Sequence, residues 1–294
     1  MVEAENRAVS MTSDYYNSQD ADTFYAEVWG GEDIHVGLYQ SANEPIFEAS
    51  QRTKITMASY LDGLNQNSRV LDIGSGYGGT ARYLAKSFGC RVAALNLSTV
   101  QNERHRRMNI EQGLDNLIEV VDGNFEDIHF QDSSFDIVWS QDAMLHSGAR
   151  GKVVSEVSRV LTESGNFIFT DLMQSADCPD DVLQPILDRL QLESMATPQF
   201  YREVSDRNGL TEVRFEQLTD QLVTHYDRVL QETQAHEAQL RHSITEKYLE
   251  NMKKGLTYWI DGGKKGYLEW GIFHFKKMTP SVQLTNARTT PWAV

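Results

Sequence analysis

The feature that most constrains the fold is a short stretch, residues 70–79, which reads VLDIGSGYGG. An apolar run ends at an acidic residue, a glycine-dense turn follows, and residues 80–85 (TARYLA) are typical of a helix. A strand, a tight turn and a helix opening in this order form the ligand-binding corner of a Rossmann-like parallel sheet. Gly74, Gly76 and Gly79 match the G-x-G-x-x-G pattern. That pattern alone is a weak signal, so the neighbouring residues must decide which ligand is bound.

The acidic residue before the turn argues against a phosphate-bearing ligand. A dinucleotide lays its pyrophosphate against the helix N-terminus, where the helix dipole favours negative charge. Asp72, two residues before the first glycine, would repel that pyrophosphate. It would instead attract the sulfonium and ammonium groups of S-adenosylmethionine, and glycines would let the backbone approach that ligand closely. We therefore expect Asp72, Gly74, Ser75 and Gly76 to bind S-adenosylmethionine.

The next apolar run, residues 91–98 (RVAALNLS), predicts a second strand that ends at Asn96. Dinucleotide enzymes usually hold the ribose hydroxyls with Asp or Glu at this place. Asn96 is neutral, but its amide can accept a hydrogen bond from one hydroxyl and donate to another. A helix cap or turn residue is the alternative role for Asn96. Ser98 is the better capping candidate for the helix that begins near Thr99.

Composition narrows the function classes. The chain has 294 residues, which suggests one large domain or a core with a lid. A formal net charge of −15 argues against a nucleic-acid partner, because phosphate binding needs a basic surface. The sequence has no apolar run long enough for a membrane span and no apolar leader, so we expect a cytoplasmic protein. Cys90 and Cys178 are isolated and the eight histidines lack ligand spacing, so no metal site is expected.

The first half of the chain predicts an alternating core. Five strands are expected, at 69–73, 91–95, 117–121, 135–140 and 166–171. Three helices are expected between them, at 78–87, 99–112 and 151–161. This alternation implies parallel βαβ units.

The second half of the chain predicts more helix. Residues 174–204 contain three prolines and predict a helical lid. Two further strands, at 211–218 and 267–277, flank a stretch at 220–260 that predicts one long helix. We expect a single domain over 21–278, with flexible segments at 1–20 and 279–294.

These motifs resemble those of class I S-adenosylmethionine-dependent methyltransferases. The resemblance rests on residues 70–76, on Asn96-Leu97-Ser98 with Gln101, and on residues 135–140 (FDIVWS). Other segments resemble the sarcosine/dimethylglycine N-methyltransferases, which make glycine betaine. These segments are residues 24–39, 139–147 (WSQDAMLHS), 184–189 and 251–260. The resemblance covers about residues 20–278. It implies a Rossmann-like seven-stranded sheet with helices on both faces, an antiparallel last strand and a lid after the fifth strand.

The resemblance also implies where the donor would bind. Asn96, Leu97 and Gln101 fall at the ribose position, where many methyltransferases have Glu or Asp instead of Asn96. Many relatives place Asp after the third strand to accept from the adenine amino group, and Asn124 stands at that position. Its carbonyl can still accept that hydrogen bond, and Phe125 can cover an adenine face.

The expected reaction sets the acceptor site. Methyl transfer to an amine ends in a quaternary ammonium, which has no N–H and is best held by aromatic faces. The aromatic candidates are Tyr25, Trp29, Tyr201, Tyr226 and Trp259. For any one of them core packing is the alternative role. Arg189 is the candidate for binding an acceptor carboxylate through two parallel hydrogen bonds, with a surface ion pair to Asp188 or Glu193 as the alternative.

Residues after the fourth strand would lie at the carboxyl edge of the sheet, where ligands bind. His146 is the candidate to accept the amine proton, because its ordinary pKa lies near working pH, and His35 is a second acid–base or lining candidate. A structural role is the alternative for His146. Strand alternation puts Gln141 and Asp142 on opposite faces, so both need not touch the ligand. We place Gln141 near the methionine or acceptor end.

The sequence therefore predicts a small-molecule N-methyltransferase that converts sarcosine and N,N-dimethylglycine to glycine betaine. Methylation of phosphoethanolamine or of a lipid-like or isoprenoid acceptor is the nearest alternative. A nicotinamide oxidoreductase on the same fold is disfavoured by Asp72 and by the neutral Asn96. A nucleoside-binding module without catalysis is a further alternative, which the glycine turn with Asn96 and Asn124 disfavours.

Overall fold

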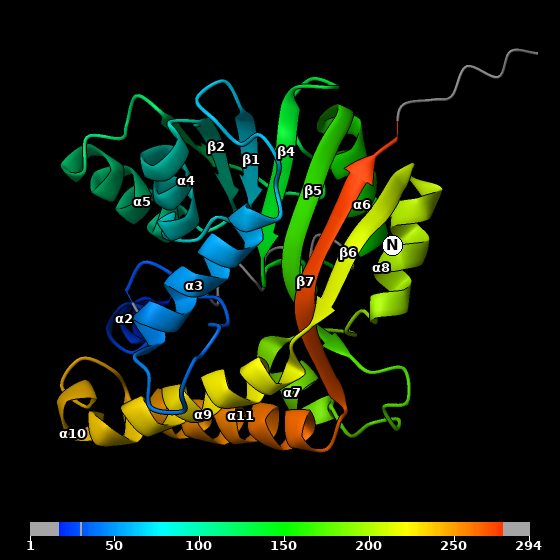
Figure 1. The fold of residues 1–294 in the computed structure, drawn as a ribbon. Coiled ribbons are helices and arrows are strands. Elements are labelled where there is room, and N and C mark those ends of the chain that lie inside the picture. The colour runs from blue at the N-terminus through cyan, green and yellow to red at the C-terminus, as the bar shows by residue number, and fades with distance from the viewer. Residues whose placement is uncertain (1–17, 30, 279–294) are drawn as a thin grey trace, which may run out of the picture.

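The computed structural model describes residues 18–29 and 31–278, and these residues form a seven-stranded sheet (Figure 1). The strands are β1 (Arg69–Ile73), β2 (Arg91–Asn96), β3 (Ile118–Asp122), β4 (Phe135–Gln141), β5 (Leu161–Gln174), β6 (Leu210–Gln217) and β7 (Leu268–Lys277). Their order is β3-β2-β1-β4-β5-β7-β6. The first five pair in parallel, and β7 is antiparallel to both β5 and β6. This arrangement confirms the predicted class I methyltransferase sheet with an antiparallel last strand.

Helices cover both faces of the sheet because its strands are apolar on both sides. Val70 of β1 packs against the helices on one face and Leu71 against those on the other, as strand alternation requires. The first face carries α3 (Ile46–Ser59), α4 (Gly79–Phe88) and α5 (Thr99–Glu111). The second face carries α6 (Arg150–Val160) and α8 (Pro198–Arg207), as Figure 1 shows.

A separate group of helices lies beyond the carboxyl ends of the parallel strands, at the bottom of Figure 1. Its members are α2 (Gln19–Glu27), α7 (Gln184–Leu190), α9 (Thr219–Ala235), α10 (Glu237–Leu240) and α11 (Glu246–Lys264). They share an apolar core of their own, which includes Trp29, Tyr226 and Trp259. These helices therefore form a roof over the edge of the sheet where α/β proteins bind ligands.

The prediction of one helix over residues 220–260 is wrong, because the structure breaks it into α9, α10 and α11. The break comes where Thr245 caps the N-terminus of α11 by accepting a hydrogen bond from the backbone N–H of Tyr248 at 3.4 Å. Once the chain turns, α9 and α11 lie side by side and bury their apolar faces against each other. A single straight helix would leave both faces in water.

The stretch at 174–204 divides between two places. Its helix α7 packs on α11, whereas α8, which begins at Pro198, packs beside β6 on the sheet. Only the first part of the stretch thus reaches the roof. Most of the expected flexible start and the whole expected tail at 279–294 lie outside the described residues, and Ser18 caps α2.

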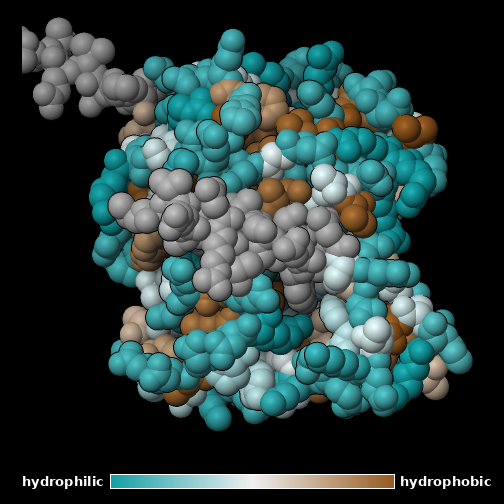
Figure 2. All heavy atoms as spheres, turned by 180° about the vertical axis from the view of Figure 1, so that it is seen from behind, coloured by the Kyte–Doolittle hydropathy of each residue, from teal (hydrophilic) through white to brown (hydrophobic). Residues whose placement is uncertain are grey.

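The surface is mostly polar on the face opposite to the view of Figure 1. The face shown in Figure 2 is mainly hydrophilic, and its apolar atoms form small separate groups. Over residues 18–29 and 31–278 we find no helix that is both long and apolar enough to cross a bilayer. The same residues contain no group of side chains arranged to bind a metal ion.

Candidate functional site

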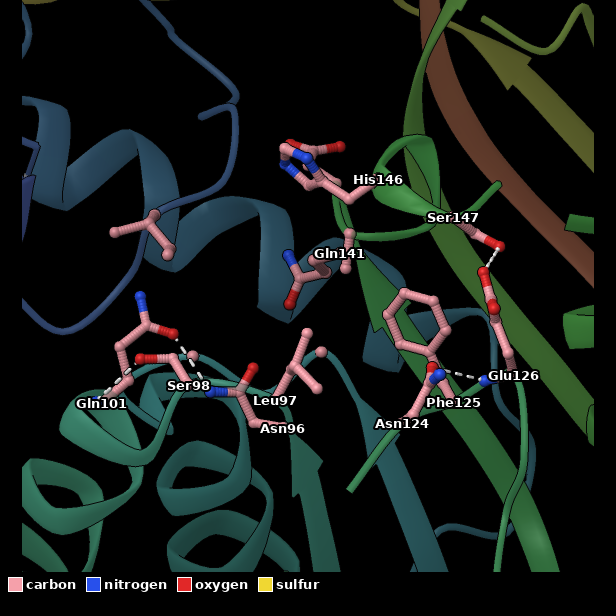
Figure 3. Close-up of a pocket in the computed structure, with 15 residues that line it drawn as sticks. Asn96, Leu97, Ser98, Gln101, Asn124, Phe125, Glu126, Gln141, His146 and Ser147 are labelled. Atoms are coloured by element: carbon pink, nitrogen blue, oxygen red, sulfur yellow. Dashed lines mark hydrogen bonds between the residues drawn. The ribbon is translucent and has the colours of Figure 1, made fainter. Parts of the chain in front are cut away.

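Three adjoining cavities open between the carboxyl edge of the sheet and the helical roof. The large cavity, of about 720 Å³, is drawn in Figure 3. Its walls are Ile34, Gly74, Gly76, Asn96, Leu97, Ser98, Gln101, Asn124, Phe125, Glu126, Gln141, Asp142, Ala143, His146 and Ser147. The glycine-turn cavity, of about 320 Å³, is lined by residues 32–35, Asp72, residues 74–77, Gly79, Thr80 and Gln141. The aromatic cavity, of about 480 Å³, is lined by Tyr25, Trp29, Ile34, Val36, Asp142, Leu145, His146, Leu172, Arg189, Leu190, Tyr226 and Trp259.

Several residues line more than one cavity, and they show where the cavities adjoin. Ile34 lines all three of them. Asp142 and His146 line both the large and the aromatic cavity, whereas Gln141 lines both the large and the glycine-turn cavity. The large and the aromatic cavity therefore adjoin at Ile34, Asp142 and His146.

The glycine turn brings bare backbone to the cavity floor. Gly74 has a φ of +74°, and a Cβ there would lie 2.3 Å from the Cβ of Ala143. Gly79 begins α4, and a Cβ there would lie 2.1 Å from Oδ1 of Asp33. Both positions require glycine, the first for its left-handed backbone and its contact and the second for its contact alone.

Among the described residues that line the glycine-turn cavity, several buried side-chain atoms have no hydrogen-bond partner. They are Oδ2 of Asp72, Oγ of Ser75, Nε2 of Gln141 and Nε2 of His35. The amide of Gln141 has a defined orientation, because its Oε1 accepts from Nε1 of Trp139 at 3.0 Å and from the hydroxyl of Thr80 at 2.5 Å. Its Nε2 is therefore a donor that awaits an acceptor. A carboxyl, a hydroxyl and an amide donor within one cavity suit a zwitterionic ligand.

The electrostatics of this cavity favour a cation near Asp72. Burial and, to a smaller extent, the neighbouring negative charge of Asp33 raise the pKa of Asp72 from 3.8 to about 7, with Lys54 opposing both. Asp33 itself is held ionised, because the Lys54 ammonium lies 2.6 Å away and keeps the Asp33 pKa below its usual value despite its burial. Asp72 is thus a buried carboxyl that gains from an incoming positive charge.

Asn96 presents an acceptor to the large cavity. Asn102 donates through Nδ2 to the backbone oxygen of Asn96 at 3.0 Å, so the Asn102 Oδ1 must be an acceptor. Asn96 then donates through its own Nδ2 to that oxygen at 3.1 Å and to Oε1 of Gln101 at 3.0 Å. Both donor hydrogens are used, so the Asn96 Oδ1 is left to face the cavity (Figure 3). Ser98 caps α5, as the sequence predicted, by accepting from the N–H of Gln101 at 3.2 Å.

The opposite wall of the large cavity comes from the chain after β3. Asn124 and Phe125 both line it, with the Phe125 ring against the open space in Figure 3. The Asn124 Oδ1 accepts from the backbone N–H of Glu126 at 2.9 Å, so it can take only one further donor. Glu126 is buried and accepts from the hydroxyl of Ser147 at 2.5 Å. This bond ties the adenine-side wall of the expected site to the chain after β4.

The connection between α2 and α3 covers the site on the side of the helical roof. Its residue Asp33 pairs with Lys54 of α3, and Nε2 of His35 lies 3.5 Å from Oδ1 of Asp33. Oδ2 of Asp142 accepts from the backbone N–H of Val36 at 2.7 Å. His35 thus lines the glycine-turn cavity beside Asp72 and does not reach the aromatic cavity.

His146 sits in a short 3-10 helix, η1 (Met144–His146), that is fixed at its middle residue. The N–H of Leu145 donates to Oδ1 of Asp171 at 3.1 Å, and Arg150 donates to the Leu145 oxygen at 2.7 Å. Burial, with a smaller contribution from the Arg150 charge, lowers the pKa of His146 to about 4. His146 is therefore neutral at physiological pH and holds a lone pair that can accept a proton.

The aromatic cavity brings together four of the five predicted aromatic residues. Tyr226 and Trp259 stack with ring centres 5.0 Å apart, and Tyr25 meets Trp29 edge-on at 5.2 Å. Arg189, from α7, contributes a permanent positive charge to the same wall. Such a cavity can hold a molecule with a cationic head and an anionic end.

The structure does not bring Tyr201 to any of these cavities. Its ring packs among Phe169 and Phe273 under α8, and its hydroxyl donates to Oδ2 of Asp171. The apolar face of α8 is bound to the sheet, so Tyr201 points into the core and not toward the edge. Its contact with the site is indirect, through Asp171 and Leu145.

Sequence reasoning missed Ile34, Glu126 and Ser147, and did not choose Asp142. Strand alternation predicted Gln141 and Asp142 on opposite faces, but both line the large cavity, because Asp142 follows the end of β4 with a φ of +50°. This turn of the chain brings both side chains into the large cavity. The acidic side chain directly after a strand at the carboxyl edge was the available signal for Asp142.

Comparison with known proteins shows which family this chain resembles in sequence and in structure. Residues 71–169 match the family described as "Methyltransferase domain". A sarcosine/dimethylglycine N-methyltransferase from Halorhodospira halochloris is 55% identical over 273 residues, which cover 93% of this chain and 98% of that protein. One from Aphanothece halophytica is 50% identical, over 90% of this chain and 95% of that protein. The crystal structure of a putative sarcosine dimethylglycine methyltransferase from Galdieria sulphuraria superposes with a TM-score of 0.85 at 41% identity, covering 90% of this chain and 99% of that one.

Proposed function

The chain belongs to the sarcosine/dimethylglycine N-methyltransferase family, and we propose that it transfers methyl groups from S-adenosylmethionine to the nitrogen of sarcosine and of N,N-dimethylglycine. The product of the second transfer is glycine betaine. The observation that carries the proposal is the junction at Asp142 and His146, where the large cavity meets an aromatic cavity that is lined by an arginine.

The cofactor cavities fit S-adenosylmethionine, which supplies an electrophilic methyl group on a positively charged sulfur. Asn96 offers its oxygen to a ribose hydroxyl, with Leu97 and Gln101 beside it. Asn124 and Phe125 are placed for an adenine ring. Asp72, Ser75 and Gln141 offer an anion, a hydroxyl and an amide donor, which suit the ammonium and carboxylate of the methionine part. Among the described residues that line the glycine-turn cavity, none is a lysine or arginine that would bind phosphate.

The aromatic cavity fits an N-methylated amino acid. Tyr25, Trp29, Tyr226 and Trp259 can hold the methylated nitrogen through their ring faces, and this attraction strengthens as positive charge forms there during the transfer. Arg189 can bind the carboxylate through two N–H groups. A phosphorylated acceptor would carry more negative charge than this one guanidinium matches.

The residues at the junction act on the reacting nitrogen. His146 is neutral and can accept the proton of an acceptor that arrives as an ammonium, which leaves the nitrogen with the lone pair that methylation requires. Asp142 is held by Val36 and by Nε1 of Trp270 at 2.8 Å, and it lines both cavities, so its carboxyl group would face the cationic groups of a bound donor and acceptor.

A product-resolved assay tests the proposal. The purified protein is incubated with isotope-labelled S-adenosylmethionine and with glycine, sarcosine, N,N-dimethylglycine or phosphoethanolamine, and labelled products are identified by mass spectrometry. We expect labelled N,N-dimethylglycine and glycine betaine from sarcosine. Arg189→Ala should raise the KM for N,N-dimethylglycine by about 10–100-fold, since a charge-assisted pair is lost.

Arg207→Ala is the matched control, because Arg207 is exposed on α8 and pairs with Glu203 away from the cavities. Methylation of phosphoethanolamine alone, or an Arg189 variant with unchanged turnover of N,N-dimethylglycine, would refute the proposed acceptor. Calorimetric titration with S-adenosylmethionine and with NADH separates the reaction classes, and binding of NADH alone would refute methyl transfer.

A further inference from the structure

Helix α11 carries a glycine at a place where the backbone gives no reason for one. Gly255 lies within the 19 residues of α11 and is buried. Its backbone is helical, so alanine would fit the conformation there. A glycine inside a helix costs about 1 kcal/mol relative to alanine. Some neighbour must therefore occupy the space that an alanine methyl group would need.

That neighbour is Arg189. A Cβ built on Gly255 would lie 2.4 Å from Nε, 2.5 Å from Cδ and 2.7 Å from Cζ of Arg189, whereas ordinary contact begins near 3.4 Å. Nη2 of Arg189 also lies 2.8 Å from Sδ of Met252, which stands one turn before Gly255 on the same side of α11. The outer half of the Arg189 side chain therefore packs against Met252 and Gly255 on the surface of α11.

The other glycines near the end of α11 serve ordinary packing. A Cβ on Gly262 would meet side-chain atoms of Leu268, and one on Gly263 would meet those of Val223 and Leu222. Those contacts are apolar and belong to the roof core. Gly255 differs, because its three nearest atoms all belong to the side chain of Arg189, a residue that lines the aromatic cavity.

We propose that Gly255 is a positioning residue: because it lacks a side chain, it sets the position of the Arg189 guanidinium and so the recognition of the acceptor carboxylate. The inference rests on the proposed function, because it assumes that Arg189 binds that carboxylate. An alanine at position 255 must move the Arg189 side chain by about 1 Å to restore ordinary contact. Misplacement by 1 Å in an enzyme site can cost about 100-fold in rate.

The test is a double-mutant cycle on the whole enzyme with four proteins: wild type, Gly255→Ala, Arg189→Ala and the double variant. For each we measure kcat and KM with N,N-dimethylglycine and with N,N-dimethylethanolamine, which lacks the carboxylate. The Kd for S-adenosylmethionine and the Tm are measured for all four. Thr257→Ala is the matched control, since Thr257 is exposed on the same helix.

We expect Gly255→Ala to raise the KM for N,N-dimethylglycine at least tenfold and to leave N,N-dimethylethanolamine within twofold. The Tm should stay equal or rise, because alanine favours the helix. The same substitution made on Arg189→Ala should change neither acceptor further, since no guanidinium is left to displace.

The outcomes separate the inference from the function on which it rests. If Arg189→Ala does not change the preference for the carboxylated acceptor, the proposed carboxylate site is overturned. If Arg189→Ala removes that preference but folded Gly255→Ala keeps it, the role of Gly255 is overturned. Equal effects of Gly255→Ala with and without Arg189, or a loss of S-adenosylmethionine binding, would show that Gly255 serves helix packing, and would overturn the inference too.

Discussion

Replacing Asp72 by asparagine should make the cofactor-free protein more stable at alkaline pH while it weakens binding of S-adenosylmethionine. Asp72 is buried below the glycine turn, and its Oδ2 has no hydrogen-bond partner among the described residues. Its pKa is raised from 3.8 to about 7, first by burial and then by the charge of Asp33. A carboxyl with a raised folded-state pKa stabilises the fold below pH 4, and that stability is lost as the pH rises toward 7.

The magnitude follows from that shift. Each pKa unit corresponds to 1.36 kcal/mol, so ionising Asp72 costs the folded state on the order of 4 kcal/mol above pH 7. The asparagine in the Asp72→Asn variant would never ionise, but its amide hydrogens would also lack partners, which costs about 1–3 kcal/mol. We therefore expect a net gain of about 1–3 kcal/mol in the free energy of unfolding at pH 8 for this variant.

Urea denaturation of both proteins at pH 5.5, 7 and 8, without ligand, measures this difference. Between pH 5.5 and 7 the wild type should lose about 2 kcal/mol relative to the variant. Over the same range the affinity of the wild type for S-adenosylmethionine should rise severalfold, because the bound cation favours ionised Asp72. The variant should bind weakly and without this dependence.

Asp171→Asn is the matched control. Burial also raises the pKa of Asp171 to about 7, but Asp171 does not line the glycine-turn cavity. It should reproduce the sign of the stability effect and leave the pH dependence of S-adenosylmethionine binding intact. A stability difference for Asp72→Asn that is the same at all three pH values would refute the reasoning, since it would mean that Asp72 does not titrate in this range.

Three further outcomes are expected. Trp29→Ala should raise the KM for N,N-dimethylglycine by about 3–30-fold, because one aromatic face that binds the cationic nitrogen is lost. The Kd for S-adenosylmethionine, measured by calorimetry, should stay within threefold of the wild-type value. Equal weakening of the binding of acceptor and cofactor would contradict this. Tyr201→Phe should lower the free energy of unfolding by about 1–2 kcal/mol in urea titrations, because Asp171 loses a donor, with acceptor KM unchanged. The kcat/KM for N,N-dimethylglycine should rise close to tenfold per unit from pH 7 to 9, and a profile that levels off near pH 5 would contradict it.

The sheet was predictable because its signals are local. The apolar run that ends at Asp72 gives β1, and the glycines after it have backbone angles that few other residues adopt. The spacing of strands and helices then implies a parallel sheet, and such a sheet binds ligands at its carboxyl edge. The residues chosen for the donor side, from Asp72 to Gln141, line the cavities there for this reason.

The parts that the sequence did not predict depend on contacts between distant segments. Ile34 lines all three cavities, and its segment is held there by contacts with distant residues: the ion pair of Asp33 with Lys54 and the hydrogen bond from Val36 to Asp142. Tyr201 was expected at the acceptor site, yet the face that α8 presents to the sheet directs it into the core. The break before α11 is likewise decided by which helix faces can bury each other.

The acceptor nitrogen must lose a proton before it can be methylated, and two residues at the junction, Asp142 and His146, bear on this step. Amines ordinarily have pKa values near 10, so N,N-dimethylglycine arrives mainly as an ammonium, which Asp142 attracts and which cannot attack a methyl group. His146 is neutral because its pKa is about 4. The transfer of a proton to it from an ammonium with a much higher pKa is therefore strongly unfavourable. An imidazolium buried beside Arg150 is unfavourable and must pass the proton on at once. The scarce species is therefore the neutral amine, and the rate should follow its abundance in solution, not the titration of His146.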